Sequence, residues 1–186
     1  MSDPYFFGYG SLVNRATHVY AKAHRATLHG WRRTWRHTAL RPVAFLTAVP
    51  APGAEIDGLI ASVPNADWLA LDDREAAYTR VRAVELDHPL PDPPEVQLYW
   101  IPEDAHGPAG VAHPIRLSYL DVVVQGYLRE FGEDGVTRFF DTTDGWDAPV
   151  DDDRDLPAYP RAQILTPEER RLVDRHLAAR TGVHVV

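Results

Sequence analysis

The sequence contains no cysteine among its 186 residues. Disulfides, thiolate nucleophiles, zinc–thiolate sites and iron–sulfur clusters are therefore excluded. No segment approaches the roughly 20 consecutive apolar residues of a membrane span. The N-terminus also lacks the basic region and apolar run of a secretory signal. We therefore expect a cytoplasmic location and no membrane partner.

Basic residues are few, 19 against 27 acidic ones, and the formal net charge is −8. Because nucleic-acid binding needs a basic surface, we expect no nucleic-acid partner. Arginine is concentrated at one place, where Arg32, Arg33 and Arg36 alternate with Trp31 and Trp35. This pattern is compatible with a phosphate-stacking patch. We favour a strand with one apolar and one solvated face, which the same alternation describes.

Metal-ligand spacings are also missing. The nine histidines are scattered and form no H-E-x-x-H pattern. The Asp-rich run 151–155 lacks the glycine and terminal glutamate of a calcium loop. We therefore expect no metal site.

The hydrophobic content of 45 % suffices for the core of one compact domain without metals or disulfides. Strands are predicted in the first hundred residues, where β-branched and aromatic residues lie between Gly and Pro turns. They cover 5–8, two strands within 26–48 that break near Arg41-Pro42, then 56–63 after the Pro-Gly turn at 52–53, 78–86 and 96–101. Helices dominate afterwards, which predicts an α+β fold rather than repeated βαβ units.

Three helices are predicted from caps and spacing. A short one covers 66–75 with Asn65 as N-cap, and a longer one begins at Ser118 and closes at Gly132 in a left-handed cap. The last begins at Thr166-Pro167-Glu168-Glu169 and ends at Gly182. The segment 141–161 between them is interpreted either as an ordered surface excursion or as a mobile lid.

The turn Gly8-Tyr9-Gly10-Ser11-Leu12 follows the first predicted strand. Successive backbone N–H groups in a glycine-bearing turn form a concave anion site that suits a carboxylate. A turn whose glycines serve backbone geometry alone is an equal alternative. The turn lacks the third glycine of a dinucleotide fingerprint, and Ser11 lacks the flanking glycines of a nucleophile elbow.

Glu75 lies on one helical stripe with Trp68, Leu71 and Asp72. A carboxylate near apolar packing has a raised pKa, as a general acid or base needs near neutral pH. The alternative is a solvated helix end or an ion-pair partner of Arg80 or Arg82. Residue spacing alone leaves both interpretations open.

Three runs together resemble the γ-glutamylcyclotransferase family, which includes ChaC-like and AIG2-like proteins. They are YFFGYGSL near the N-terminus, DGLIASVPNADWLALDDREAAYTRVRAVEL in the middle and SYLDVVVQGYLREFG later. The resemblance covers about residues 5–132. It implies a small mixed β-barrel with flanking helices and a cavity at one barrel mouth.

The resemblance also implies a reaction and its residues. The α-amino group of a γ-glutamyl compound attacks its own γ-carbonyl, which yields 5-oxoproline and a free amine without a cofactor. Glu75 would be the catalytic acid and base. Substrate binding would fall to Tyr9, Gly10, Ser11, Leu12 and Tyr119. For Tyr119, substrate positioning and structural packing of its ring remain equal alternatives.

We expect a single domain over 1–186, with 141–186 as a C-terminal extension beyond the family pattern. Within it, Trp146, Arg154 and Tyr159 are candidates for specificity residues or for structural ones. The expected partner is a small γ-glutamyl substrate, and both a monomer and a homodimer remain possible. A non-catalytic protein that binds a small anion or an amino-acid-like ligand on the same fold is the alternative function.

Overall fold

The computed structural model of the chain describes residues 3–108 and 112–180. In these residues the strands are β1 (Tyr5–Gly8), β2 (His24–Thr38), β3 (Arg41–Ser62), β4 (Thr79–Arg82), β5 (Leu86–Asp87), β6 (Val96–Trp100), β7 (Gly107–Pro108), β8 (Ile115–Arg116), β9 (Thr143–Asp144) and β10 (Val150–Asp151). The α-helices are α1 (Leu69–Arg74), α2 (Leu117–Asp141) and α3 (Pro167–Ala178).

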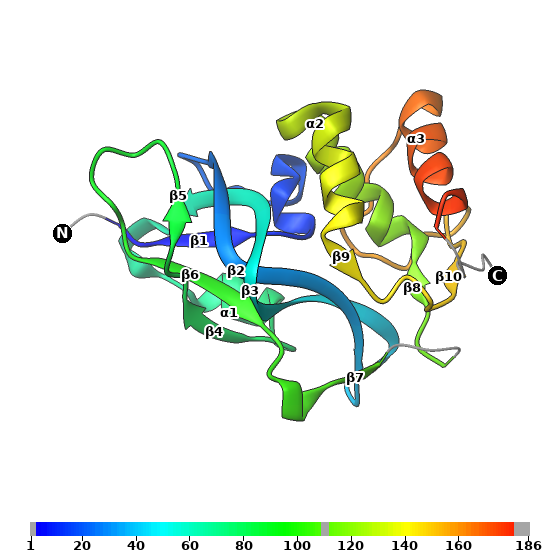
Figure 1. Cartoon of the computed structure of the whole chain (residues 1–186), viewed down its shortest axis with the longest axis horizontal. Coiled ribbons are helices and arrows are strands. Elements are labelled where there is room, and N and C mark those ends of the chain that lie inside the picture. The colour runs from blue at the N-terminus through cyan, green and yellow to red at the C-terminus, as the bar shows by residue number, and fades with distance from the viewer. Residues whose placement is uncertain (1–2, 109–111, 181–186) are drawn as a thin grey trace.

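One mixed sheet dominates the molecule, with the strand order β4-β6-β1-β3-β2-β5. β1 lies between β6, to which it is parallel, and β3, to which it is antiparallel. The long β2–β3 hairpin curls the sheet into a half-barrel, and α2 and α3 lie side by side beyond one end of it (Figure 1). The predicted α+β class, a mixed barrel-like sheet with flanking helices, is confirmed.

The β2–β3 hairpin is longer than the sequence predicts. A strand end at Pro52-Gly53 was expected, but β3 continues through it. Gly53 has a positive φ of 82°, and the ladder passes from the pair His29 and Glu55 to the pair Trp31 and Pro50. Residues 51–54 of β3 therefore form an irregularity within the strand, and β3 is paired with β2 before and after them.

The prediction of one strand over 78–86 is also wrong, because β4 ends at Arg82 and β5 begins at Leu86. Glu85 between them has a positive φ of 57°, which a continuous strand does not allow. The predicted helix over 66–75 is shorter than expected and begins at Leu69. Asn65 is not its cap, since it lies in a separate 3-10 turn with a φ of 58°.

Helix α2 passes the glycine that was expected to end it. Gly132 has the predicted positive φ, 70°, but helical backbone resumes after it and continues to Asp141. Ser118 is not the N-cap, a position that Arg116 holds. The Ser118 hydroxyl instead donates to Asp153 at 2.6 Å.

The capping box of α3 is present, because Thr166 and Glu169 bond each other's backbone N–H groups. The helix ends at Ala178, and the predicted end at Gly182 lies outside the described residues. Upstream of α3, β9 pairs with β2 and β10 pairs with β8. These pairings anchor part of the segment 141–161, while the division into a domain and an extension stays a prediction.

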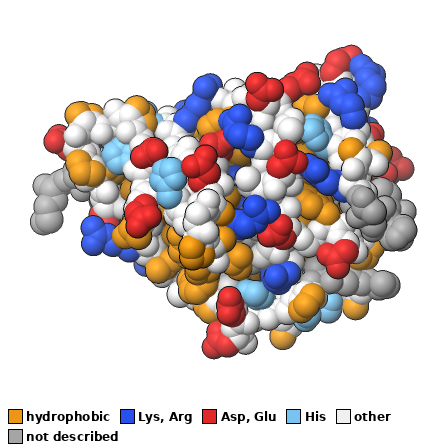
Figure 2. Space-filling view, viewed as in Figure 1, with side chains coloured by type: hydrophobic (Ala, Val, Ile, Leu, Met, Phe, Trp, Pro, Cys, Tyr) orange, Lys and Arg blue, Asp and Glu red, His pale blue; other side chains and the backbone are white. Residues whose placement is uncertain are grey.

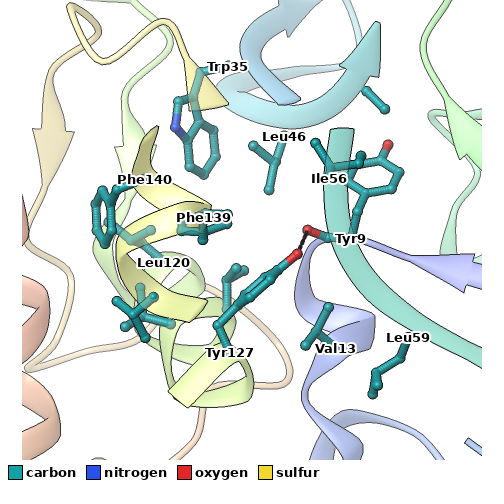
Figure 3. Close-up of a cluster of buried hydrophobic side chains, with 14 of the residues drawn as sticks. Tyr9, Val13, Trp35, Leu46, Ile56, Leu59, Leu120, Tyr127, Phe139 and Phe140 are labelled. Carbon is teal, nitrogen blue, oxygen red and sulfur yellow. Dashed lines mark hydrogen bonds between the residues drawn. The ribbon is translucent and has the colours of Figure 1, made fainter. Parts of the chain in front are cut away.

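The main core lies between the sheet and the two long helices, and Figure 3 shows part of it around Tyr9, Trp35, Tyr127 and Phe139. A second, smaller apolar cluster packs on the other side of β1. It contains Leu12, the last residue of the turn after β1, and Leu71 of α1. Because both leucines are buried in one cluster, the turn and the end of α1 are held near each other.

Arg33 is fully buried in the main core and corrects our interpretation of the arginine cluster. It shares the period-two face of β2 with Trp31 and Trp35, whereas Arg32 lies on the more exposed face and pairs with Asp144 at 2.7 Å. The prediction of a solvated arginine face is therefore wrong for Arg33. Its position inside the core also excludes it from a surface phosphate patch.

Hydrogen bonds to neutral oxygens compensate the burial of the Arg33 guanidinium. It donates to the Tyr9 carbonyl at 3.1 Å, the Asp57 carbonyl at 2.6 Å, the Thr142 hydroxyl at 2.6 Å and the Tyr127 hydroxyl at 2.6 Å. It also lies 5.1 Å from the ring centroid of Tyr127. Tyr127 in turn donates to the Tyr9 carbonyl at 2.9 Å, the dashed line in Figure 3. Arg33 and Tyr127 thus fix the backbone at the start of the turn.

Every helix within the described residues is too short or too polar to span a lipid bilayer. On the face shown in Figure 2, acidic and basic side chains are interspersed over the surface, and apolar side chains gather below the centre of the view.

We predict that Arg33→Lys destabilises the protein by about 2–4 kcal/mol, because an ammonium cannot reach all four acceptors and leaves buried oxygens unpaired. Urea unfolding of the purified variant measures the change. The matched control is Arg32→Lys, which alters an exposed ion pair and is expected to change the free energy of unfolding by less than about 0.5 kcal/mol. Equal effects of the two substitutions would contradict the role assigned to Arg33.

Candidate active site

Two connected cavities lie where the turn after β1 meets the end of α1. The inner pocket is small, about 30 Å³, and is lined by the turn Gly8–Leu12 together with Glu75 and the rings of Tyr78, Tyr99 and Tyr119. The outer groove is much larger, about 590 Å³. The residues common to both linings are Ser11, Leu46, Glu75, Tyr78 and Tyr119. These shared residues mark the junction between the two cavities.

The turn presents backbone rather than charged side chains to the inner pocket. Val13 and Asn14 donate their N–H groups to the carbonyls of Gly10 and Ser11, at 3.0 and 3.1 Å. In contrast, the N–H groups of Gly10 and Leu12 donate to no backbone carbonyl of a described residue. The turn therefore has donors left for a ligand.

Glycine is required at position 10 by a close approach. A Cβ added there would lie 2.6 Å from the Tyr119 hydroxyl oxygen. Real Cβ atoms do not come so close to other heavy atoms, so a larger residue would push Tyr119 away from the turn. The absence of a side chain at Gly10 thus lets α2 contribute Tyr119 to the pocket.

Glu75 directly follows α1, and its backbone N–H donates to the Leu71 carbonyl at 2.9 Å. Leu71 is fully buried and anchors the helix. The Glu75 side chain is only 16 % exposed, and its carboxylate lies 3.0 Å from the Arg74 guanidinium. The alternative of an ion pair with Arg80 or Arg82 is not what the structure has, because Glu75 pairs with Arg74 and Arg80 pairs with Asp72 at 2.8 Å.

Burial raises the pKa of Glu75 above its ordinary value of 4.5, since a carboxylate loses solvation in the pocket. The positive charges of Arg74 and Arg161 and the hydrogen bond from Arg74 oppose this shift of the pKa. The net effect is a pKa above that of an exposed glutamate, so the Glu75 carboxylate is a stronger base.

Arg74 joins Glu75 to the turn. Besides pairing with Glu75, it donates to the Thr17 carbonyl at 2.8 Å and to the Ser11 hydroxyl at 3.1 Å. Its side chain is 7 % exposed, so these bonds form away from bulk water. One guanidinium thus fixes the distance between the carboxylate and Ser11.

The tyrosines of the pocket are neutral donors at ordinary pH. Burial raises the pKa of Tyr78 and of Tyr119 well above the usual 10. The Tyr78 hydroxyl donates to the Leu46 carbonyl at 2.9 Å, and the Tyr9 hydroxyl donates to the Tyr99 carbonyl at 2.5 Å. The ring of Tyr9 is thus part of the scaffold, while its backbone begins the turn.

All of the predicted site residues line the inner pocket, namely Tyr9, Gly10, Ser11, Leu12, Glu75 and Tyr119. Their chemical roles stay predictions. The sequence reasoning missed Tyr78, Tyr99, Arg74 and Arg161. Arg74 alone had a usable signal, its position directly before Glu75.

The three specificity candidates of the C-terminal segment separate in the structure. Trp146 is buried and stacks on Phe140, with 4.8 Å between ring centroids. Arg154 is committed to an ion pair with Asp121 at 2.7 Å. Tyr159 lines the outer groove, and its hydroxyl donates to the Ser11 hydroxyl at 2.9 Å. Only Tyr159 of the three therefore reaches the site.

No group of three or more histidine, aspartate or glutamate side chains within residues 3–108 and 112–180 is arranged to hold a metal ion. The site thus combines one partly desolvated carboxylate, backbone donors and neutral tyrosines. This set of groups suits proton transfer on a bound carboxylate-bearing ligand.

Comparison with known proteins agrees with this architecture. The gamma-glutamyl cyclotransferase of a solved structure matches with a TM-score of 0.56 at 13 % identity, over 93 % of this chain and 99 % of that one. An uncharacterized human protein, loc79017, matches with 0.58 at 12 % identity, over 94 % and 99 %. YkqA from Bacillus subtilis matches with 0.57 at 15 % identity, over 96 % of this chain and 55 % of its own. At such identities the likeness shows the fold alone.

A comparison with curated proteins gives no match. The sequence itself matches the family described as gamma-glutamyl cyclotransferase, AIG2-like, over residues 6–115. This range includes the turn after β1, the long hairpin, α1 and Glu75. The chain belongs to the AIG2-like gamma-glutamyl cyclotransferase family.

Proposed function

We propose that this protein converts a γ-glutamyl compound to 5-oxoproline and releases the free amine, with Glu75 as general base and then general acid. The observation that carries the proposal is the common pocket of Glu75 and the turn Tyr9–Leu12. A base and an anion site beside one ligand are what an intramolecular attack by an amino group requires.

The substrate α-carboxylate would bind the N–H groups of Gly10, Ser11 and Leu12. The inner pocket has space for a group about the size of a carboxylate, so the rest of the substrate would extend past Glu75 into the groove. The proposed orientation thus brings the α-amino group, next to the bound carboxylate, within reach of Glu75.

The reaction moves two protons and exchanges one carbon–nitrogen bond for another. Glu75 as a carboxylate takes a proton from the α-ammonium, and the freed amine attacks the γ-carbonyl carbon to form a ring nitrogen–carbon bond. The protonated Glu75 returns that proton to the leaving nitrogen as its bond to the γ-carbon breaks. The ring nitrogen then gives up a second proton, which Glu75 passes to the released amine, so that the amine leaves as an ammonium. A carboxyl group with a raised pKa serves both steps, since its charged form is a stronger base than an exposed carboxylate and its protonated form can return the proton.

Orientation supplies much of the proposed rate, because the open-chain substrate must fold back on itself. The side chains of Tyr78 and Tyr119 line the inner pocket and narrow the space in which the substrate can bind. For Tyr119, a hydrogen bond to substrate and purely structural packing remain the two alternatives. The reaction is an internal acyl transfer, and its stoichiometry includes no cofactor.

A non-catalytic ligand-binding protein is the alternative, and one observation favours it. The Arg74 guanidinium lies 3.0 Å from the Glu75 carboxylate. An ion pair stabilises the charged form and weakens it as a base. On that alternative, γ-glutamyl ligands bind at the turn and are not turned over.

We predict that Glu75→Gln lowers kcat for 5-oxoproline release by about 10²–10⁴-fold while KM changes little, because the amide cannot accept the proton. Chromatographic detection of 5-oxoproline after incubation with a panel of γ-glutamyl compounds measures the loss. Glu103→Gln, which neutralises an exposed carboxylate outside both cavities, is the matched control and is expected to retain wild-type rates.

Two outcomes would count against the proposal. A folded Glu75→Gln protein with wild-type rates would remove Glu75 from the chemistry. Calorimetric binding of γ-glutamyl compounds by the wild type, without 5-oxoproline from any of them, would support the binding protein instead.

We predict an acidic limb in the pH dependence of kcat/KM whose midpoint lies above 4.5, the ordinary pKa of a glutamate. Only the charged form of Glu75 is a base, so activity rises as pH increases through the raised pKa. Arg74→Gln is expected to move this midpoint to higher pH, because Arg74 lowers the pKa of Glu75. Initial rates at low substrate concentration between about pH 4 and 9 test both statements, and a shift to lower pH would contradict the second.

A further inference from the structure

The outer groove is positively charged in a protein that is acidic overall. Its charged lining residues are four arginines, Arg41, Arg74, Arg116 and Arg161, against Asp73 and Glu75. The whole chain carries a formal net charge of −8. The excess of positive charge is thus local to the groove, where it attracts anionic groups over short distances.

Two of these arginines are committed to partners inside the protein. Arg74 bonds Glu75, Ser11 and Thr17, and Arg116 pairs with Asp151. Among the residues that the structure describes, no carboxylate lies within 4.0 Å of the guanidinium groups of Arg41 or Arg161. These two groups are therefore available to a ligand.

Arg161 has the more defined position. It belongs to the stretch 158–161 that forms one wall of the groove. The Tyr159 hydroxyl bonds Ser11 at 2.9 Å, the Ala158 N–H donates to Asp153 at 2.9 Å, and the Ala162 N–H donates to the Tyr159 carbonyl at 3.1 Å. Arg161 is partly buried, whereas Arg41 is exposed at the start of β3.

Arg161 also acts on the reacting side of the groove, since its positive charge lowers the pKa of Glu75. Glu75 lines both cavities and marks their junction. If the glutamyl carboxylate is held in the inner pocket, the bond to be broken lies near Glu75 and the leaving amine extends into the groove. A substituent on that amine would therefore meet Arg161.

Resting on the proposed function, we propose that Arg161, with Arg41 beside the same groove, selects γ-glutamyl compounds whose leaving amine bears a carboxylate. The substrate class is then the γ-glutamyl amino acids and peptides with a free C-terminal carboxylate, in preference to uncharged γ-glutamyl amines. A guanidinium recognises a carboxylate through two parallel N–H donors, which an amide or an alkyl group cannot match.

The test compares two substrates that differ in one group, γ-glutamyl-alanine and γ-glutamyl-alaninamide. They have nearly the same size, and only the first carries the second carboxylate. Formation of 5-oxoproline gives kcat/KM for each with the full-length protein. We expect the wild type to prefer the acid by about tenfold or more, mostly through KM, as for a charge-assisted hydrogen bond at a partly exposed site.

Variants identify the residue responsible. Arg161→Gln is expected to reduce the preference to within about twofold, and Arg161→Lys to retain part of it. Because any effect on the pKa of Glu75 applies to both substrates, the ratio of their kcat/KM values removes it. The control is Arg170→Gln, an exposed arginine of α3 outside both cavities, which is expected to keep the wild-type ratio.

The possible failures are distinguishable. Equal kcat/KM values for the two substrates in the wild type, or an unchanged ratio in both Arg161→Gln and a double variant with Arg41→Gln, would overturn the selection by these arginines and leave the cyclotransferase function intact. Absence of 5-oxoproline from both substrates and from a wider γ-glutamyl panel would overturn the proposed function and this inference with it.

Discussion

The site depends on the carbonyl oxygen of Tyr9. Arg33 and Tyr127 both donate to it, from β2 and α2, and neither donor is accessible to water. β2 and α2 are thus joined to the residue that follows β1, within the turn. These hydrogen bonds fix the Tyr9 carbonyl on the core side of the turn, which leaves the N–H groups of the turn free to face a ligand. A buried cation without a carboxylate partner is otherwise costly, which indicates how strongly the four acceptors compensate it.

The state of Glu75 is set by two opposing electrostatic effects. Burial disfavours the carboxylate, while Arg74 and Arg161 favour it. Without the arginines the pKa of this carboxyl group would be higher still, and without the burial the carboxylate would be a weaker base. Arg74 also bonds Ser11, so one side chain both adjusts the proton affinity of Glu75 and fixes its distance from the turn.

Much of the fold was predictable because it follows from local patterns. The strand Tyr5–Gly8, the last helix with its Thr166 cap and the α+β class come from residue periodicity and capping chemistry. The errors occurred where longer-range packing overrides local signals. The Pro52-Gly53 turn does not end β3, and Gly132 does not end α2, because pairing or helical structure resumes after each interruption. Glycine allows the backbone to adopt a positive φ. Whether the strand or helix ends there depends on the packing and hydrogen bonding of the residues that follow.

The sequence by itself determined the family pattern and the residues around the inner pocket. The turn and the stretch that carries Glu75 are each a short continuous run, so each can be recognised from the spacing of its residues. Only the tertiary structure decided their neighbours. Arg33 lies inside the core, Arg74 clamps Glu75 to Ser11, and Arg161 enters the groove from a segment more than 80 residues beyond Glu75. The reason is physical: the burial and partners of a charged side chain depend on contacts between distant segments, and no local periodicity encodes them.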